Sequence, residues 1–474
     1  MAKNTDLIPW SVQDILDATG GTLISGSGDR GFKGVGIDSR MITARDLFVA
    51  IEGPAHDGHC FAADVIDSGV HGLVVGRDKI STLPIGRRQK RDVVCIAVDD
   101  TTRALGDMAA FNRRRADVSV VAVTGSNGKT STRAMITAVI AGRHATLTPT
   151  GNFNNEIGLP LTLLQLTPAH RWAVVELGMN HFGEIRRLAE ICSPDVGIIT
   201  NIGPAHLEGL GSIDGVMQAK AELLEKIRPG GTIILNADDP RTLKLSQKQV
   251  LPVLLFGMGA TADIKGKATG ASGRKNSFIL EVPGEEICID LQAHGDFMVS
   301  NALAAAAVGY QLGFSAGEIK IGLESFRPVH GRMNLLRTSM GLNIIDDTYN
   351  ANPDSMKAAI RTLMVLAEGK PVVMVAGDML ELGDDAAALH FEIGKKAANA
   401  GIGRIYITGA FSRAIADGAL SQGMDGDNIF TGSQVEIIRD LKQYLSPDHW
   451  LLVKGSRGMA MERTVKEIKN WANK

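Results

Sequence analysis

Continuous apolar runs alternate with helix-like segments through most of the chain. Runs of β-branched residues without intervening polar positions are typical of strands buried on both faces of a parallel sheet. One intervening stretch, 213–227, has the apolar spacing of a helix and ends before Pro229 and two glycines. The alternation predicts a parallel sheet with helices on both faces. The runs that predict its strands are 118–123 (VSVVAV), 172–177 (WAVVEL), 196–200 (VGIIT) and 232–236 (TIILN).

The pattern changes at both ends of this region. Residues 1–98 combine short apolar runs with Gly and Asp turns, which indicates a small mixed α/β domain. After residue 330 a second series of apolar runs begins, each followed by a helix-like segment, as in a Rossmann-like fold. Shorter alternating pieces over 262–292 predict antiparallel strands. We therefore expect an α/β protein of three domains, 1–98, 99–330 and 331–474.

Composition narrows the class of protein. The 474 residues carry 50 basic and 52 acidic side chains, and a net charge of −2 gives no electrostatic reason to expect nucleic acid or an anionic membrane as partner. The four cysteines have no zinc-ligand spacing, and their scarcity favours a reducing compartment. No apolar run has the length of a membrane helix, and the N-terminus lacks a signal-peptide pattern. We expect a cytoplasmic protein without membrane insertion and, since nothing demands an oligomer, a monomer.

A basic cluster lies in the segment 84–92, with Arg87, Arg88, Lys90 and Arg91. A solvated loop is the simpler interpretation, and a patch that holds a nucleotide is the alternative.

The sharpest local motif is a glycine-rich turn between a predicted strand and a predicted helix. In this context glycines let backbone N–H groups approach phosphate oxygens, and the helix N-terminus adds positive potential. Lys129 is placed to reach the β- and γ-phosphates, and Thr130 to bind Mg²⁺. Val123 stands where the general pattern has its first glycine. The turn still predicts a phosphate-binding loop in an ATPase-type central domain, and it comprises Gly125, Ser126, Asn127, Gly128, Lys129, Thr130 and Ser131.

Three further polar residues stand out by position. Glu176 ends the run 172–177, where an acid points into the ligand crevice of a parallel sheet and can bind Mg²⁺. His206 follows the run 196–200, and Lys220 lies in the helix-like stretch. Taken alone, Glu176 could be a surface acid, His206 a structural histidine and Lys220 a solvated lysine.

Together these features resemble the Mur ligase family, the ATP-dependent amide-forming enzymes of peptidoglycan precursor synthesis. The N-terminal segments IDSR, DLFVAI and DGHCF resemble the UDP-sugar-binding domain of the later ligases in the pathway. The segments TYNANPDSM, GDMLELG and VKGSRGM resemble the member that joins D-alanyl-D-alanine to UDP-N-acetylmuramoyl-tripeptide. The central pieces that carry the resemblance, in family order, are VTGSNGKTST, GNFNNEIGLPLTLL, ELGMNHFGEI, NIGPAHLEGLGS, AKAELL, NADDP, HGDFMVSNALAAAA and HGRMN.

The resemblance implies a reaction in two steps. The terminal carboxylate of the tripeptide attacks the γ-phosphate of ATP, which gives an acyl phosphate and ADP. The amine of D-alanyl-D-alanine then displaces phosphate. The resemblance implies catalytic roles for Lys129, His206 and Lys220, with Thr130 and Glu176 on one Mg²⁺ and His206 on a second. Lys220 matches a lysine that is carbamylated by CO₂ in the family and can then bind or orient the second metal.

The remaining roles follow from matched motifs. Asn301 matches the adenine contact, Arg332 a contact to the nucleotide phosphates, and Asp347 a residue near the ribose. The TYNANPDS segment could instead be only a turn and a helix start, capped by Asp354 or Ser355. The substrate residues that the resemblance implies are Ser39 and Arg40 for the UDP-sugar, Asn154 and Asn155 for the peptide, and Asn350, Asn352, Lys454 and Arg457 for D-alanyl-D-alanine.

Several alternatives stay open at this point. Two alternatives are other amide ligases of the same superfamily. A folylpolyglutamate synthase would lack the UDP-type N-terminal domain that this chain resembles. The ligase that adds the third stem residue carries an acceptor motif different from TYNANPDS and GDMLELG. The chain could instead be a binding or scaffold protein that uses a nucleotide as a switch. It could also be a relative of these ligases that has lost catalytic activity. The third residue of the tripeptide is open between diaminopimelate and lysine.

Overall fold

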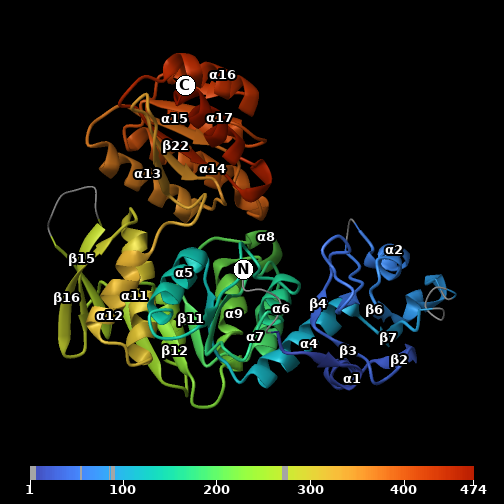
Figure 1. Ribbon diagram of the computed structural model, residues 1–474. Helices are drawn as coiled ribbons and strands as arrows, with labels where there is room; N and C mark the ends of the chain where they lie inside the picture. The colour runs from blue at the N-terminus through green and yellow to red at the C-terminus, as the bar shows by residue number, and fades with distance from the viewer. Residues whose placement is uncertain (1–6, 54–55, 85, 87–90, 270–275, 474) are drawn as a thin grey trace.

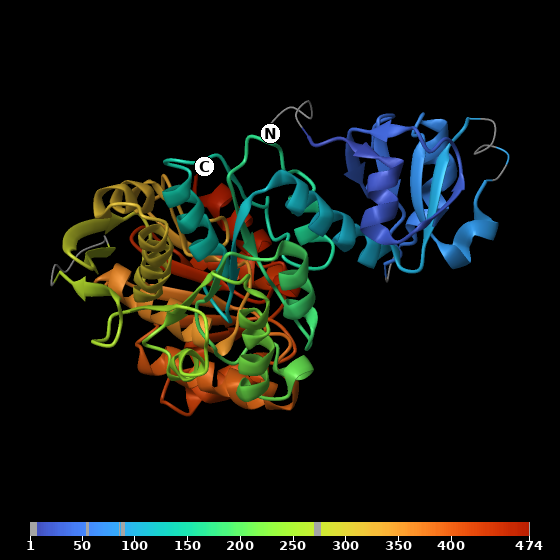
Figure 2. The same ribbon diagram turned by 90° about the horizontal axis from the view of Figure 1, so that it is seen from below.

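Three α/β units, each built on its own sheet, make up the chain (Figure 1). The computed structural model describes residues 7–53, 56–84, 86, 91–269 and 276–473. The C-terminal unit lies against the central one, whereas the N-terminal unit stands to the side, as the view from below also shows (Figure 2). Arg87, Arg88 and Lys90 of the basic cluster lie outside the described residues, while Arg91 donates to the carbonyl of Ile66 at 2.7 Å.

The N-terminal unit contains a five-stranded sheet in the order β2-β7-β6-β5-β4. Its strands are parallel except β2, which pairs antiparallel with β7. A two-stranded ribbon of β1 and β3 lies beside it. The elements are β1 (Trp10–Ser11), α1 (Val12–Thr19), β2 (Thr22–Ser25), β3 (Gly31–Phe32), β4 (Gly34–Gly36), β5 (Asp46–Val49), η1 (Gly58–Phe61), α2 (Ala62–Asp67), β6 (Gly72–Gly76), η2 (Arg77–Thr82) and β7 (Val94–Val98).

Helix α4 (Thr101–Ala116) connects the N-terminal and central units. Asp100 caps it by accepting from the backbone N–H groups of its first turn. Near its end Arg115 lies 5.1 Å from the ring centroid of Trp10 and 3.8 Å from the carboxylate of Asp14. The helix therefore anchors the first sheet to the second.

The central unit holds a nine-stranded sheet in the order β16-β15-β14-β13-β12-β11-β8-β10-β9. Strands β8 to β14 run parallel, and β15 and β16 add the antiparallel edge that the alternating pattern predicts. In β8, Val121 and Val123 pack on one face and Val120 and Ala122 on the other. Its strands are β8 (Ser119–Thr124), β9 (Thr146–Leu147), β10 (Trp172–Glu176), β11 (Val196–Ile199), β12 (Thr232–Asn236), β13 (Val253–Gly257), β14 (Ile264–Ala268), β15 (Asn276–Val282) and β16 (Glu285–Leu291).

The central helices cover both faces of this sheet. The predicted helix over 213–227 is wrong after Ala221, where α9 ends, and a tighter 3₁₀ turn follows at Leu224–Lys226. There the carboxylate of Glu222 accepts from the backbone of Gly183 and Arg186, which ties the helix end to α7. The helices are α5 (Lys129–Ile140), α6 (Gly158–Leu163), α7 (Glu184–Cys192), α8 (Leu207–Leu210), α9 (Ile213–Ala221), η3 (Leu224–Lys226), α10 (Pro240–Ser246), α11 (Asp296–Gln311) and α12 (Ala316–Ser325).

The C-terminal unit has a six-stranded sheet in the order β17-β18-β22-β19-β20-β21, parallel except for β17. The inner strands β18, β19, β20 and β22 correspond to the predicted series of apolar runs (LNIIDD, VVMVAG, RIYITG and WLLVKG), and the short edge strands β17 and β21 were not predicted. The elements are β17 (Asn334–Arg337), β18 (Asn343–Asp347), α13 (Pro353–Ala367), β19 (Val372–Ala376), η4 (Gly383–Asp385), α14 (Ala386–Asn399), β20 (Arg404–Ile407), α15 (Ser412–Leu420), η5 (Gly426–Asn428), β21 (Ile429–Thr431), α16 (Gln434–Tyr444), β22 (Trp450–Lys454), η6 (Arg457–Met459) and α17 (Glu462–Ala472).

Candidate active site

A cavity of about 940 Å³ lies where the carboxyl ends of the central and C-terminal strands face each other. Ligands of open α/β sheets bind at this edge, because the loops that follow the strands gather there. Most of the predicted site residues line this one cavity. They are Ser126, Asn127, Gly128, Lys129, Ser131, Asn154, Asn155, Glu176, His206, Asn301, Arg332, Asp347, Asn350, Asn352 and Lys454.

Two glycines of the predicted phosphate-binding loop stand where no side chain fits. Gly128 caps α5 at φ 83°, and a Cβ there would lie 2.2 Å from Oδ1 of Asn301. Gly125 has φ 153°, and its Cβ would lie 1.9 Å from Oγ1 of Thr200. Nζ of Lys129 donates to the carbonyl of Gly125 at 2.7 Å. The loop is thus held tightly, and most of its residues line the cavity: Ser126, Asn127, Gly128, Lys129 and Ser131.

A buried carboxylate faces this loop. Glu176 is 2% exposed and accepts from Oγ1 of Thr130 at 2.8 Å and from Nδ2 of Asn154 at 2.9 Å. A hydroxyl and a carboxylate side by side suit a hard cation such as Mg²⁺. Among the described residues no group of three or more His, Cys, Asp or Glu side chains could hold a metal by itself. A Mg²⁺ here would complete its coordination with water and with oxygens of a bound phosphate, which is how Mg²⁺ usually binds at nucleotide sites.

Positive charge is concentrated around Glu176. Burial lowers the pKa of both Lys129 and Arg133, while the carboxylate of Glu176 acts in the opposite direction on each. Arg332 reaches the same region from the junction between the units, with its guanidinium 4.1 Å from the ring centroid of Tyr349. Three cations around one carboxylate make the site attractive to polyphosphate and carboxylate groups.

Lys220 is not among the residues that line the cavity. It is 1% exposed, so its interpretation as a solvated lysine is wrong. Its ammonium group has no hydrogen bond or ion pair with any residue that the structure describes. Burial, together with the nearby charge of Lys129, holds the pKa of Lys220 well below its usual range. Burial favours the neutral amine of a lysine over its ammonium form, and the neutral amine is the form that reacts with CO₂.

The C-terminal unit contributes a second polar group. Nζ of Lys454 bonds to Oδ2 of Asp347 at 2.5 Å and to the carbonyl of Asn350 at 2.9 Å. Asn352, rather than Asp354 or Ser355, caps α13, because its Oδ1 accepts from the backbone of Ser355. The same amide donates across the cleft to Oδ1 of Asn127 at 2.8 Å. The TYNANPDS segment is therefore a helix start and also part of the cavity.

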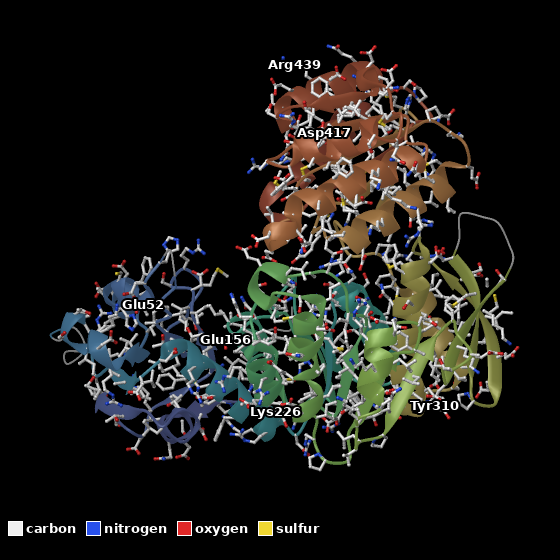
Figure 3. All side chains as sticks on the ribbon, turned by 180° about the vertical axis from the view of Figure 1, so that it is seen from behind. Glu52, Glu156, Lys226, Tyr310, Asp417 and Arg439 are labelled. Atoms are coloured by element: carbon white, nitrogen blue, oxygen red, sulfur yellow. The ribbon has the colours of Figure 1, made fainter. Side chains whose placement is uncertain are left out.

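Several predicted residues lie outside the cavity wall. Ser39 and Arg40 belong to the N-terminal unit, where Arg40 is bound to Asp38 and holds the pKa of that carboxyl at about 2. Arg457 pairs with Glu462 at 3.3 Å and lies 5.7 Å from the ring centroid of Tyr349. Gly125 and Thr130 belong to the phosphate-binding loop but are not among the residues that line the cavity. Figure 3 shows Glu156, another wall residue, at the side of the central unit that faces the N-terminal unit.

Sequence reasoning missed part of the wall. Tyr349 lies inside the TYNANPDS segment, and Asp238 and Asp239 lie in NADDP, so both motifs pointed to these positions without marking single residues. Arg361 lies on α13 and carried no local signal.

The fold and the cavity define a class of protein: a P-loop protein whose central and C-terminal α/β domains close on a shared cleft. Residues 123–309 match the family model for the Mur ligase middle domain. Residues 331–457 match the Mur ligase, glutamate ligase domain, and residues 31–113 the Mur ligase family, catalytic domain.

Curated relatives narrow this class to one family. The UDP-N-acetylmuramoyl-tripeptide–D-alanyl-D-alanine ligase of Escherichia coli (strain K12) is 35% identical over 437 residues, which are 91% of this chain and 92% of that protein. The enzyme of the same name from Bacillus subtilis (strain 168) is 33% identical over 465 residues, 98% of this chain and 99% of that protein. The chain belongs to the Mur ligase family.

Solved structures agree with this assignment. A crystal structure of MurF from Acinetobacter baumannii superposes with a TM-score of 0.88 at 32% identity and covers 98% of this chain and 100% of that one. MurF ligase from Thermotoga maritima, solved in complex with ADP, shares the fold with a TM-score of 0.81 at 24% identity, over 92% of this chain and 97% of that one. No helix in the described parts of the chain is both long and apolar enough to cross a membrane.

Replacing Lys220 should stabilise the ligand-free protein. The folded state holds the pKa of Lys220 below its ordinary value, so at neutral pH the unfolded chain binds the extra proton more readily. In EDTA and CO₂-depleted buffer, Lys220→Met should raise the free energy of unfolding at pH 7 by about 1–3 kcal/mol. The wild-type free energy of unfolding should rise with pH toward 10, and the gain from the variant should shrink over the same range.

Urea unfolding at pH 7, 8.5 and 10 measures this difference. Lys226→Met is the matched control, because Lys226 is partly exposed and paired with Glu190 at 2.8 Å. A Lys220→Met variant that is less stable than wild type at every pH would contradict the unpaired state of this lysine.

Proposed function

We propose that this chain is an ATP-dependent ligase that joins D-alanyl-D-alanine to UDP-N-acetylmuramoyl-tripeptide and forms the pentapeptide precursor of peptidoglycan. The names of the E. coli and B. subtilis relatives, which cover more than nine tenths of this chain, support the proposal. The observation that carries it is the cleft, in which a cationic phosphate loop faces Asp347, Asn350 and Lys454 of another domain. In this proposal the chain acts as a monomer in the cytoplasm.

The first step brings two anions together. The terminal carboxylate of the tripeptide attacks the γ-phosphate of ATP, and repulsion between the two groups must be offset by positive charge. Lys129, the N-terminus of α5 and, from the domain junction, Arg332 are proposed to supply this charge to the phosphates, and both side chains line the cavity. Asn154 and Asn155 line the same wall and are proposed to orient the peptide. Asn301, packed against Gly128, is proposed as the adenine contact and Asp347 as a residue near the ribose.

Mg²⁺ fits the oxygen donors present. Thr130 and Glu176 would hold one ion, and His206 with a carbamylated Lys220 would hold a second. When bound, such ions neutralise phosphate oxygens and polarise the acyl group. The burial of Lys220, which lowers its pKa and favours the neutral amine, supports the carbamate. A carbamate would give this lysine an anionic group that can orient a metal.

The second step needs the C-terminal domain. The amine of D-alanyl-D-alanine attacks the acyl carbon, phosphate leaves with the oxygen that it received, and an amide bond remains. Asn350, Asn352, Lys454 and Arg457 gather at the carboxyl end of the C-terminal sheet and are proposed to hold the dipeptide. Closure of this domain over the cleft excludes water, which would otherwise hydrolyse the acyl phosphate. Ser39 and Arg40 of the N-terminal unit are proposed to hold the UDP-sugar end.

Phosphate release should require both substrates. With ATP and Mg²⁺, the purified chain should release phosphate and form a pentapeptide product, followed by mass, only when UDP-N-acetylmuramoyl-tripeptide and D-alanyl-D-alanine are both present. Lys129→Met should lower kcat by at least about 100-fold, because it removes the main cation at the phosphates.

Lys466→Met, on the exposed face of α17, is the control and should leave the rate unchanged. Phosphate release without a product would favour a nucleotide-driven switch. Product formation with glutamate or another amino acid in place of the dipeptide would overturn the substrate assignment.

A carbamate on Lys220 predicts chemical rescue. Lys220→Ala should lose ligase activity, and a short carboxylic acid such as acetate or formate should restore part of it, since the free acid replaces the anionic group. The rate as a function of acid concentration measures the effect, and Lys226→Ala should show neither the loss nor the gain. Absence of rescue at every concentration, with the variant folded, counts against the carbamate.

A further inference from the structure

One loop of the C-terminal domain reaches the central domain at His206. The loop follows β19, and Oε2 of its Glu381 lies 2.6 Å from Nδ1 of His206. The backbone carbonyl of Glu381 also accepts from the N–H of Glu208 at 3.2 Å, at the start of α8. We call these two contacts, from Glu381 to His206 and to Glu208, the domain clasp.

Two residues of the clasp have an unfavourable backbone conformation. His206 has φ 57° and Glu381 has φ 63°, in the left-handed region that residues other than glycine seldom adopt. Helix α8 has no side-chain cap of its own, so the carbonyl of Glu381 satisfies one of its first N–H groups. Strained residues persist only where their surroundings hold them. The clasp therefore adds to the contact that the central domain itself makes with this backbone, the bond from the N–H of Leu210 to the carbonyl of His206 at 3.2 Å.

The clasp also connects to the C-terminal side of the cavity. The N–H of Leu380 donates to Oγ of Ser456 at 2.8 Å, and the same hydroxyl lies 3.3 Å from the carbonyl of Ala351. Ala351 lines the cavity between Asn350 and Asn352. A continuous set of hydrogen bonds thus runs from the proposed dipeptide site to His206.

We infer that Glu381 is a positioning residue, which fixes the ring of His206 through Nδ1 only when the two domains are closed. A carboxylate on Nδ1 sets the tautomer and leaves Nε2 as the acceptor, and Nε2 has no hydrogen-bond partner in the part of the chain that the structure describes. His206 lines the cavity, so closure completes the site at which the acyl group is activated. The inference rests on the proposed function, since it gives closure over the dipeptide a role in the first chemical step.

Four variants distinguish the contribution of the Glu381 carboxylate from that of the backbone contact between Glu381 and Glu208. Glu381→Ala and Glu381→Gly remove the carboxylate, and the glycine accepts the positive φ without strain. Glu381→Gln keeps an oxygen that accepts from Nδ1. Glu208→Ala is the matched control, because Glu208 joins the clasp through its backbone N–H alone. All four are made in the full chain, and thermal unfolding checks that each folds.

Two readouts test the clasp. The ring ¹⁵N resonances of His206 are identified with a His206→Gln variant and recorded with a non-hydrolysable ATP analogue. They should report a hydrogen-bonded proton on Nδ1 in wild type, Glu208→Ala and Glu381→Gln. The Ala and Gly variants should lose this signature. Their kcat for ligation should fall by about 10–100-fold, as for residues that orient a ligand. KM for D-alanyl-D-alanine should change little, and Glu381→Gln should recover most of kcat.

The outcomes are distinct. Unchanged kcat in both the Ala and Gly variants, or a wild-type ring signal that does not depend on Glu381, overturns the inference. If wild type makes no pentapeptide while the ring signal still follows Glu381, the proposed function fails and the clasp stands.

Discussion

Positive charge buried around a single carboxylate is the constraint on which the rest of the structure depends. The carboxylate of Glu176, which is almost fully buried, raises the pKa of Lys129 and of Arg133, whereas the charge of Arg332 lowers both. Cations that cluster in a poorly solvated place repel one another, and an incoming polyphosphate relieves that repulsion. The glycines of the phosphate loop and the strand ends of the central sheet hold these groups in position before any ligand arrives.

The division into domains follows from the same chemistry. A site that joins two anions and then admits an amine must open for three substrates and exclude water during reaction. The cavity is built from two sheets that face each other, so movement of one domain can open or close it. Asn127 with Asn352, and His206 with Glu381, are hydrogen-bonded pairs that exist only while the two domains are together. These contacts between the two domains are therefore made by residues that include members of the candidate active site.

The sequence predicted the parts that are local and missed those that need the folded chain. Continuous β-branched runs indicated the inner strands, and a strand–turn–helix with glycines indicated the phosphate loop, because each signal lies within a few neighbouring residues. Lys220 sits in a helix with an ordinary polar pattern, so its burial depends on packing that no short window contains. Glu381 finds its partner 175 residues away, across a domain boundary. Short edge strands such as β21 carried no continuous run.

Transfer of an oxygen from the tripeptide to phosphate tests the central claim most directly. UDP-N-acetylmuramoyl-tripeptide with both oxygens of its terminal carboxylate labelled with ¹⁸O is incubated with ATP, Mg²⁺ and D-alanyl-D-alanine, and the released phosphate is analysed by mass. If the carboxylate attacks the γ-phosphate in this cleft, each phosphate carries one ¹⁸O atom. Phosphate without ¹⁸O, released in step with the pentapeptide, would contradict activation through an acyl phosphate.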